Sequence, residues 1–461
     1  MGILTGEHTV VFPEVDFTRQ DLQRYMNYAP LIRELHFKQT LEIRFLSQDL
    51  LRSFQKALGD EPGVLSPNLA SFAWLVDLDH WLAPKVLRQI PLTLSLFVGN
   101  SVKSLQCRLG RDLNIRMVLS TSGRLPNLQH LTFFGRAQDS LEDSLTPYPW
   151  TNLQSISLVG PSVSVIPHLA RLPRLYTIRI KYMRDTILGP AAAHAVASDP
   201  SSFKALKEIG VHGHELAYAA KVFSYLPPTN SVHYAHCSTS SAATPEECNA
   251  SIDILQNHLN PSTVQWLEVR DLVNDGSSSF SGKRLTESDG VGAYVDAVVD
   301  ISPLFKFTGV RVLFLCVHPR ALVTPTHSEM VPKCWPRIQH LDLCSTLPIG
   351  RLPSIDYTHL LQVVRGCKSL QVLGLPFDGT QLPDVDDVMV VSFSVKTLRV
   401  CGSPLQSDIE QMEDILWKTL PHLNTLNFTY HPWLHVEGPS NTLWNRIAEE
   451  MELEVCDESE D

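Results

Sequence analysis

The sequence predicts an α/β fold, a solenoid in which each repeat adds one short strand to a parallel sheet. The prediction depends on a nine-residue apolar pattern, its recurrence along the chain, and helix signals between the copies. The clearest copy is Trp-Pro-Arg-Ile-Gln-His-Leu-Asp-Leu at 335–343. Leu341 and Leu343 alternate with polar residues and so share one strand face, and Ile338 adds an apolar residue at the strand's start. One such strand cannot bury its apolar edge alone, so it requires neighbouring copies.

Copies of this spacing recur through the chain, with apolar residues at their first, fourth and sixth positions. They are Leu128, Leu131 and Phe133; Leu153, Ile156 and Leu158; Leu175, Ile178 and Ile180; Leu206, Ile209 and Val211; Val264, Leu267 and Val269; Val310, Leu313 and Leu315; Leu370, Leu373 and Leu375; Val395, Leu398 and Val400; and Leu423, Leu426 and Phe428. Weaker copies begin at Ile32 and Leu69. About ten matches indicate the leucine-rich-repeat pattern. They predict an irregular horseshoe with a parallel concave sheet and convex helices.

Helix signals lie between the copies. Thr244-Pro-Glu-Glu is a capping box with proline at the first helical position, and it predicts a helix that ends near Leu259. Ser407-Asp-Ile-Glu is a second capping box in front of an apolar face. Helical spacing also predicts helices at 16–28, 47–58, 216–226 and 441–451.

Other segments are harder to assign to a helix or a strand. Residues 91–98 are predicted to form a strand, and 232–235 is interpreted as an irregular strand. Glycine and serine in 274–292 predict a mobile loop.

The pattern divides the chain into four parts. Residues 1–124 hold irregular repeats and helices, and 125–437 form the leucine-rich-repeat-like solenoid. A helix at 438–451 is expected to cap the end of the solenoid, and 452–461 form an acidic tail.

Composition excludes several classes of protein. The net charge is −11, and eight of the acidic residues lie between Glu449 and Asp461, which leaves a nearly neutral body. Neither half has the basic stripe that a phosphate backbone requires, so we expect no nucleic-acid partner. The longest apolar run, 312–317, is too short to span a bilayer, and no secretory signal is visible, so no membrane partner is expected. Nine scattered cysteines without a C-x-x-C pair indicate reduced thiols and a cytoplasmic or nuclear protein.

Catalytic and cofactor motifs are incomplete. His214-Glu215 begins like a zinc-protease H-E-x-x-H motif, but Tyr218 stands where the second histidine would have to be. Gly290-Val-Gly292 lacks both the third glycine and the preceding strand of a dinucleotide-binding turn. We therefore predict no catalytic, cofactor-binding or metal-binding residues, no cofactor and no enzyme activity.

Several phrases resemble the large fungal, basidiomycete-type F-box proteins. They are Ser302-Pro-Leu-Phe-Lys-Phe, Cys334-Trp-Pro-Arg, Leu373-Gly-Leu-Pro-Phe-Asp and Gly402-Ser-Pro-Leu, with Tyr28-Ala-Pro-Leu-Ile-Arg-Glu-Leu near the start. The resemblance implies leucine-rich repeats that present substrates to a Skp–cullin–F-box ubiquitin ligase. The helical F-box itself is not evident before Phe17, so a Skp-type adaptor is expected as a partner only if that module is missing from this sequence.

The strand residues between the buried apolar positions point to the other face of the sheet. Around three strands they are aromatic or charged: Trp266, Glu268, Arg270, Val312, Phe314, His340 and Asp342. Elsewhere they are mostly small or polar, as at Ser157 and Thr177. This composition predicts a protein-binding patch on the concave face.

Three alternatives remain open. Trp266 and Phe314 could instead pack under the 274–292 insertion or against the last helix. The chain could be an enzyme whose site is assembled from dispersed residues. It could also be a paralogue without an F-box that has an unrelated binding role.

Overall fold

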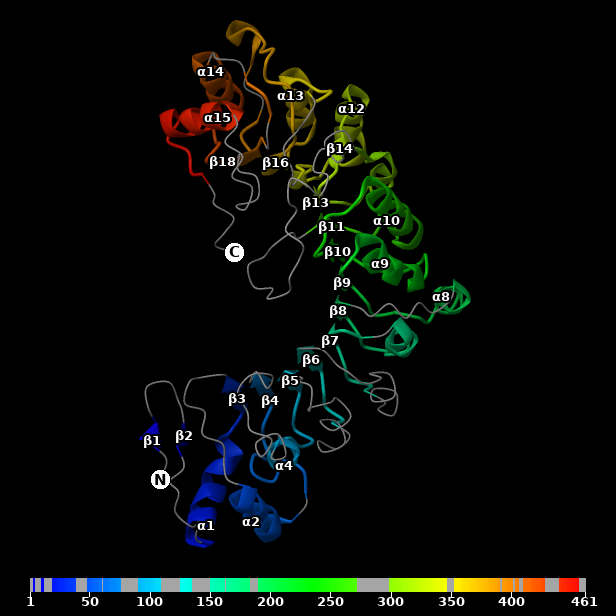
Figure 1. Cartoon of the computed structure of the whole chain (residues 1–461), viewed down its shortest axis with the longest axis vertical. Coiled ribbons are helices and arrows are strands. Elements are labelled where there is room, and N and C mark those ends of the chain that lie inside the picture. The colour runs from blue at the N-terminus through cyan, green and yellow to red at the C-terminus, as the bar shows by residue number, and fades with distance from the viewer. Residues whose placement is uncertain are drawn as a thin grey trace, which may run out of the picture. The chain divides into compact units, whose positions relative to one another are not determined.

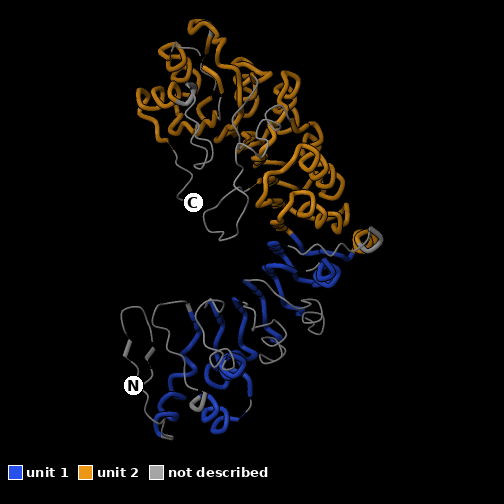
Figure 2. The backbone as a smooth tube through the Cα atoms, viewed as in Figure 1, with its two compact units in different colours: residues 1–189, 201–206 blue, residues 190–200, 207–461 orange. Residues whose placement is uncertain are grey.

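The computed structural model describes sixteen stretches of the chain, and all that follows concerns them. They are residues 3–4, 10–11, 19–38, 48–59, 61–75, 90–108, 125–134, 150–161, 163–182, 190–271, 298–345, 352–389, 392–400, 403–405, 409–427 and 439–455. Parallel strands alternate with helices along the chain, which confirms the predicted α/β class (Figure 1). The chain forms two compact units (Figure 2). The first holds residues 1–189 and 201–206, and the second holds 190–200 and 207–461.

The first unit contains a parallel sheet whose strands follow one another in chain order. Its strands are β3 (Glu34–Lys38), β4 (Ser71–Leu75), β5 (Ser104–Arg108), β6 (His130–Phe134), β7 (Ser155–Val159) and β8 (Thr177–Lys181). Its helices are α1 (Arg19–Tyr28), α2 (Gln48–Leu58), α4 (Ile90–Phe97) and α7 (Ile166–Ala170). A short antiparallel pair, β1 (Ile3–Leu4) and β2 (Val10–Val11), precedes them.

The second unit repeats this arrangement. Its main parallel sheet holds β9 (Glu208–Gly213), β10 (Tyr234–Thr239), β11 (Trp266–Asp271), β13 (Val312–Cys316), β15 (His340–Asp342), β16 (Val372–Gly374), β17 (Thr397–Arg399) and β18 (Thr425–Asn427). Its helices are α8 (Pro190–Ala197), α9 (Leu216–Lys221), α10 (Pro245–His258), α12 (Pro325–Cys334), α13 (Tyr357–Gly366), α14 (Ile409–Thr419) and α15 (Pro439–Glu450). The strands β12 (Val298–Asp300) and β14 (Arg320–Leu322) form a separate parallel pair.

The predicted apolar triads form the core of both units. From Leu69 to Val400, every member of the named triads is at most 1% exposed. Leu423 and Leu426 are also buried, whereas Phe428 lies outside the described residues. The first weak copy, which begins at Ile32, is only half-buried because β3 is the edge strand of its sheet.

Asparagine side chains join successive repeats at the starts of the strands. The Nδ2 atoms of Asn68, Asn127 and Asn152 each donate to a backbone carbonyl of the preceding repeat, at 2.9 Å. These carbonyl groups lie at turns, outside the pairing of the strands, and so need another hydrogen-bond donor. The bonds explain why Pro-Asn-Leu recurs in front of the strands at Leu69 and Leu128.

Most predicted helices are confirmed. In α10, Thr244 Oγ1 accepts from the Glu247 amide at 3.2 Å, and the Thr244 amide donates to the Glu247 carboxylate at 3.0 Å. The segment predicted at 216–226 is α9 followed by a 3₁₀ helix, Val222–Tyr225. The second capping box begins at residues 407–408, which lie outside the described residues, as does the predicted loop at 274–292.

The prediction of a strand at 91–98 is wrong, because the segment is helix α4. Its leucines alternate as they would in a strand, but its apolar residues also follow a helical period. Ile90, Leu94 and Phe97 are spaced as on one helix face, and all three are buried. Pro91 lies in the first helical turn, where its missing N–H leaves no bond unmade. Strands β4 and β5 pair directly, so no strand can enter the sheet between them.

The interpretation of 232–235 also needs correction. Strand β10 begins at Tyr234, runs to Thr239 and is a regular central strand that pairs with both β9 and β11. Its triad is Val232, Ala235 and Cys237, all fully buried, and the small alanine weakened the pattern.

Helix α15 and the residues after it cover the last strand, β18. The Trp444 ring packs against Phe377 at 6.0 Å, and its Nε1 donates to the Ser403 carbonyl at 2.9 Å. The Leu426 amide of β18 donates to the Glu454 carbonyl at 3.1 Å. An edge strand whose N–H groups are paired no longer offers them to other chains.

Candidate functional site

The strongest candidate site lies on one face of the second unit's sheet. Helices α9 and α10 cover the opposite face (Figure 1). The Sγ atom of Cys237, an inward-facing residue of β10, lies 4.0 Å from the Leu216 carbonyl of α9. By strand alternation, His236 and Ser238 point away from that helix.

The parallel register aligns residues of this face into rows. One row is Tyr234, Trp266, Val312 and His340, and the next is His236, Glu268, Phe314 and Asp342. All seven residues predicted from the sequence therefore lie on adjacent strands. We call Tyr234, His236, Trp266, Glu268, Arg270, Phe314, His340, Asp342 and Arg399 the sheet-face cluster.

An aromatic line crosses four strands of the cluster. The ring centroids of Tyr234 and Trp266 are 5.3 Å apart, and those of Trp266 and Phe314 are 5.8 Å apart. The His340 ring follows at 4.0 Å from Phe314. Aromatic pairs in this distance range attract each other beyond their area burial, so the line stiffens the face.

Glu268 is the polar centre of the cluster. Trp266 Nε1 and the Tyr234 hydroxyl donate to its Oε2 at 3.1 and 3.3 Å. His236 Nδ1 lies 3.2 Å from the same oxygen, and Arg270 Nε lies 2.5 Å from Oε1. Burial opposes ionisation of this carboxyl, but the contacts with His236, Arg270 and Trp266 outweigh it and lower the pKa of Glu268 to about 2. The carboxylate therefore stays ionised and bonded at neutral pH.

Arg270 is held on two sides. Its Nε faces Glu268, and its guanidinium carbon lies 4.6 Å from the Phe314 ring centroid. This is the geometry of a cation–π contact. The Arg270 side chain is 35% exposed, whereas its counter-ion is 8% exposed.

A second ion pair lies farther along the same face. Asp342 of β15 pairs with Arg399 of β17 across β16, and Asp342 also accepts from the Cys344 amide at 3.0 Å. The pair passes over Gly374 of β16, where any Cβ atom would overlap Asp342 Oδ1. The Asp342 side chain is fully buried and that of Arg399 is 15% exposed. The glycine leaves room for the ion pair.

His340 lies between the two ion pairs. Burial lowers the pKa of its imidazole to about 4, because the charged form would lose its solvation. Its Nε2 atom is buried and has no hydrogen-bond partner among the described residues. The ring is therefore neutral at pH 7 and acts as part of the aromatic line.

The predicted patch is less exposed than the sequence suggested. Glu268, Phe314 and Asp342 are buried, while Trp266, Arg270, Val312 and His340 are partly exposed. The 274–292 insertion that could cover Trp266 and Phe314 lies outside the described residues.

The sequence reasoning missed Tyr234, His236 and Arg399. All three flank an inward-facing residue at positions equivalent to the predicted ones. Treating β10 as a regular strand would have identified the first two.

A serine, a histidine and a carboxylate also come together on this face. His236 Nε2 is 2.8 Å from Ser238 Oγ, and His236 Nδ1 is 3.2 Å from Glu268 Oε2. His212 Nδ1 lies 3.0 Å from the same hydroxyl. These are the residue types of nucleophilic acyl transfer.

Two features oppose that chemistry at Ser238. The residue is fully buried, so a substrate carbonyl cannot approach its hydroxyl. It also lies inside a strand that is paired on both sides, so the sheet uses the backbone N–H groups that an oxyanion hole would need. The two histidine contacts give the buried Ser238 hydroxyl its hydrogen-bond partners.

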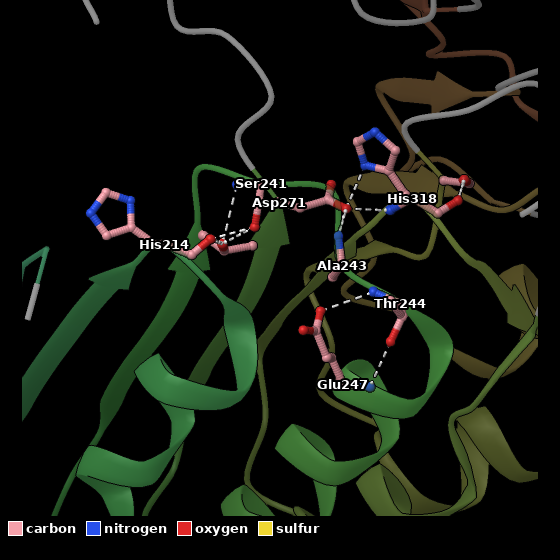
Figure 3. Close-up of polar contacts among 9 residues, drawn as sticks. His214, Ser241, Ala243, Thr244, Glu247, Asp271 and His318 are labelled. Atoms are coloured by element: carbon pink, nitrogen blue, oxygen red, sulfur yellow. Dashed lines mark hydrogen bonds and ion pairs between the residues drawn. The ribbon is translucent and has the colours of Figure 1, made fainter. Parts of the chain in front are cut away.

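A separate polar network lies at the carboxyl ends of the strands (Figure 3). Asp271, the last residue of β11, accepts from the amides of Ala243 and His318 at 3.3 and 2.6 Å. Nδ1 of the His318 ring is 2.5 Å from the same carboxylate oxygen. Both side chains are almost completely buried, at 0% and 3% exposure. This carboxylate ties the segments that follow β10 and β13 to the end of β11.

Within the described ranges, no group of three or more His, Cys, Asp or Glu residues is arranged to hold a metal ion. The described helices include none with the length and hydropathy needed to cross a bilayer. No protein-family model matches the chain, and no curated protein matches it significantly.

Proposed function

We propose that this chain is a non-enzymatic protein-interaction scaffold whose sheet-face cluster binds a segment of a partner protein. In this proposal the repeats form an irregular leucine-rich-repeat horseshoe, with the cluster on its concave side. The observation that carries the proposal is the aromatic line through Trp266 and Phe314, flanked by the Glu268–Arg270 ion pair.

The inward side of the sheet supplies the buried core, because the triads pack there with residues of the helices that cover that side (Figure 1). Tryptophan, tyrosine and arginine on the other side are the residues that dominate binding energy at protein interfaces. Charges of both signs flank the rings, which is typical of the polar surroundings of such an interface.

The resemblance to fungal F-box proteins suggests a setting for this binding. There, the scaffold would be the substrate-recognition part of a Skp–cullin–F-box ubiquitin ligase. Because no F-box is evident in this sequence, we expect a purified Skp-type adaptor, titrated into the chain by calorimetry, to bind weakly or not at all. Binding at micromolar affinity or tighter would contradict that expectation and would support the ligase role.

Site-specific photocrosslinking tests the scaffold itself. A photoreactive amino acid at Val312, a partly exposed position beside the aromatic line, is expected to capture a protein in cells. The same amino acid at Glu329 on α12 is the matched control, because Glu329 is exposed on a helix. Trp266→Ala, confirmed as folded by circular dichroism, should abolish the Val312 adduct. Identical adducts from both positions would contradict the proposal.

A further inference from the structure

Arg270 has hydrogen-bond donors that no residue in the described ranges accepts. Its Nε edge faces Glu268, and the Phe314 ring fixes the plane of the guanidinium. The two terminal nitrogens have no hydrogen-bond acceptor among the described residues, and the side chain is 35% exposed. A guanidinium held in this way presents a rigid fork, which loses little entropy when it binds a planar anion.

The charged groups near Arg270 already have partners within the sheet. Oε2 of Glu268 has contacts with Tyr234, Trp266 and His236, and Oε1 faces Arg270. Arg399 pairs with the fully buried Asp342 and is only 15% exposed. A charged partner therefore finds open donors at Arg270, whereas the carboxylates of Glu268 and Asp342 already accept from groups within the sheet.

We propose that Arg270 is the anchor for an aspartate or glutamate side chain in an acidic, partly apolar peptide segment of the partner. This inference rests on the proposed function and names its partner class. One open fork matches one planar carboxylate, which accepts two parallel N–H bonds. The partly exposed ring of Trp266 lies where apolar residues beside that carboxylate would pack.

A phosphate group fits this site less well. A dianion needs more than one open cation, and here the second arginine is bound to Asp342. The Glu268 carboxylate beside Arg270 would also repel a double negative charge more strongly than a single one. Charge complementarity thus favours a carboxylate.

A random peptide library displayed on phage tests this inference on the full chain. We expect enriched peptides to share an aspartate or glutamate flanked by apolar residues. Binding of a synthetic consensus peptide should weaken at least about 10-fold with Arg270→Ala, as at an interface hot spot. Arg270→Lys should also weaken it, because an ammonium keeps the charge but lacks the fork. Arg446→Ala, at an exposed arginine on α15, is the matched control and should bind like the parent.

The outcomes separate this inference from the proposed function. If no peptide enriches on the folded parent, or if enriched peptides bind Trp266→Ala unchanged, binding at the sheet-face cluster is refuted. If peptides need Trp266 but lack an acidic residue or tolerate Arg270→Ala, the scaffold stands and the carboxylate anchor is refuted. If inorganic phosphate binds as tightly as the peptide and competes with it, the site is a phosphate site and the inference is wrong.

Discussion

The sheets of the two units carry the same kinds of residue on their inward side and different kinds on the other side. On the inward side, both hold fully buried triads, such as Leu153, Ile156 and Leu158 in the first unit and Ile338, Leu341 and Leu343 in the second. On the other side, the middle row of the first unit is mostly small or polar: His36, Ala73, Gln106, Thr132, Ser157 and Arg179. The corresponding row of the second unit includes His236, Glu268, Phe314 and Asp342.

This difference separates the requirements of folding from those of binding. Stacked repeats need one buried apolar side, and both units supply it in the same way. Ser157 and Thr132 show that a strand of this fold does not need large residues on its other side. The rings and ion pairs of the second unit therefore exceed what the fold requires, which supports a role in recognition.

The largest expected effect tests the shared side. Leu341→Asp in the second unit and Ile156→Asp in the first should each destabilise the protein by at least about 4 kcal/mol, because a buried carboxylate without a partner is costly. Urea denaturation followed by circular dichroism measures this loss. If either variant kept the parent's urea midpoint, the two units would not depend on their buried triads in the same way.

A smaller effect is expected at the strand-end network of the second unit. Asp271→Ala leaves the amides of Ala243 and His318 buried without their acceptor, and should lower the free energy of unfolding by about 3 kcal/mol. Asp253→Ala, at an exposed position of α10, should change it by less than about 0.5 kcal/mol. Equal values for the two variants would show that the network does not hold these segments.

The middle rows can be compared directly at Asp342 and Ser157. Asp342→Ala leaves Arg399 without its counter-ion, and we expect a loss of about 2–3 kcal/mol, since Arg399 keeps some access to water. Ser157→Ala in the first unit should cost less than about 0.5 kcal/mol. A double-mutant cycle with Arg399→Ala isolates the pair. A coupling energy near zero would mean that the ion pair adds nothing to stability.

The smallest effect is the pH dependence that His340 contributes in the second unit. The folded state keeps His340 neutral, with a pKa of about 4 against 6.5 for the free imidazole. Its contribution is fully present above pH 6.5 and is lost as the pH falls toward 4, because the unfolded chain takes up the proton first. The loss should be about 1–3 kcal/mol.

The His340 contribution can be separated from that of other groups. Glu268, with a pKa of about 2 against 4.5, loses its contribution only below pH 4.5, so the two windows hardly overlap. Unfolding free energies at pH 7 and pH 5 should therefore differ less in His340→Gln than in the parent. The control, His130→Gln, removes an exposed histidine at the equivalent position of the first unit and should keep the parent's difference. The same profile in all three proteins would refute the assignment.

The sequence by itself determined the inward side of the sheet. The triads are local patterns of period two, and each copy supports the others, so most strands from Leu69 to Val400 could be placed without knowing their partners. The exceptions were β5, which was not predicted, and β10, which was predicted only in part. Helix α10 was equally visible, because its capping box lies within four consecutive residues, Thr244 to Glu247. Strand alternation also gave the outward position of Trp266, Glu268 and Phe314.

Tertiary structure alone decided the rest, because those features depend on residues far apart in the chain. Residues 90–97 carry both a strand and a helix period, and only the direct pairing of β4 with β5 excludes the strand. Asp271 and His318 are 47 residues apart, and Asp342 and Arg399 are 57 apart, so no local pattern indicates either pair. The burial of Glu268 and the open fork of Arg270 likewise arise where β10, β11 and β13 meet, since the neighbouring strands supply their contacts.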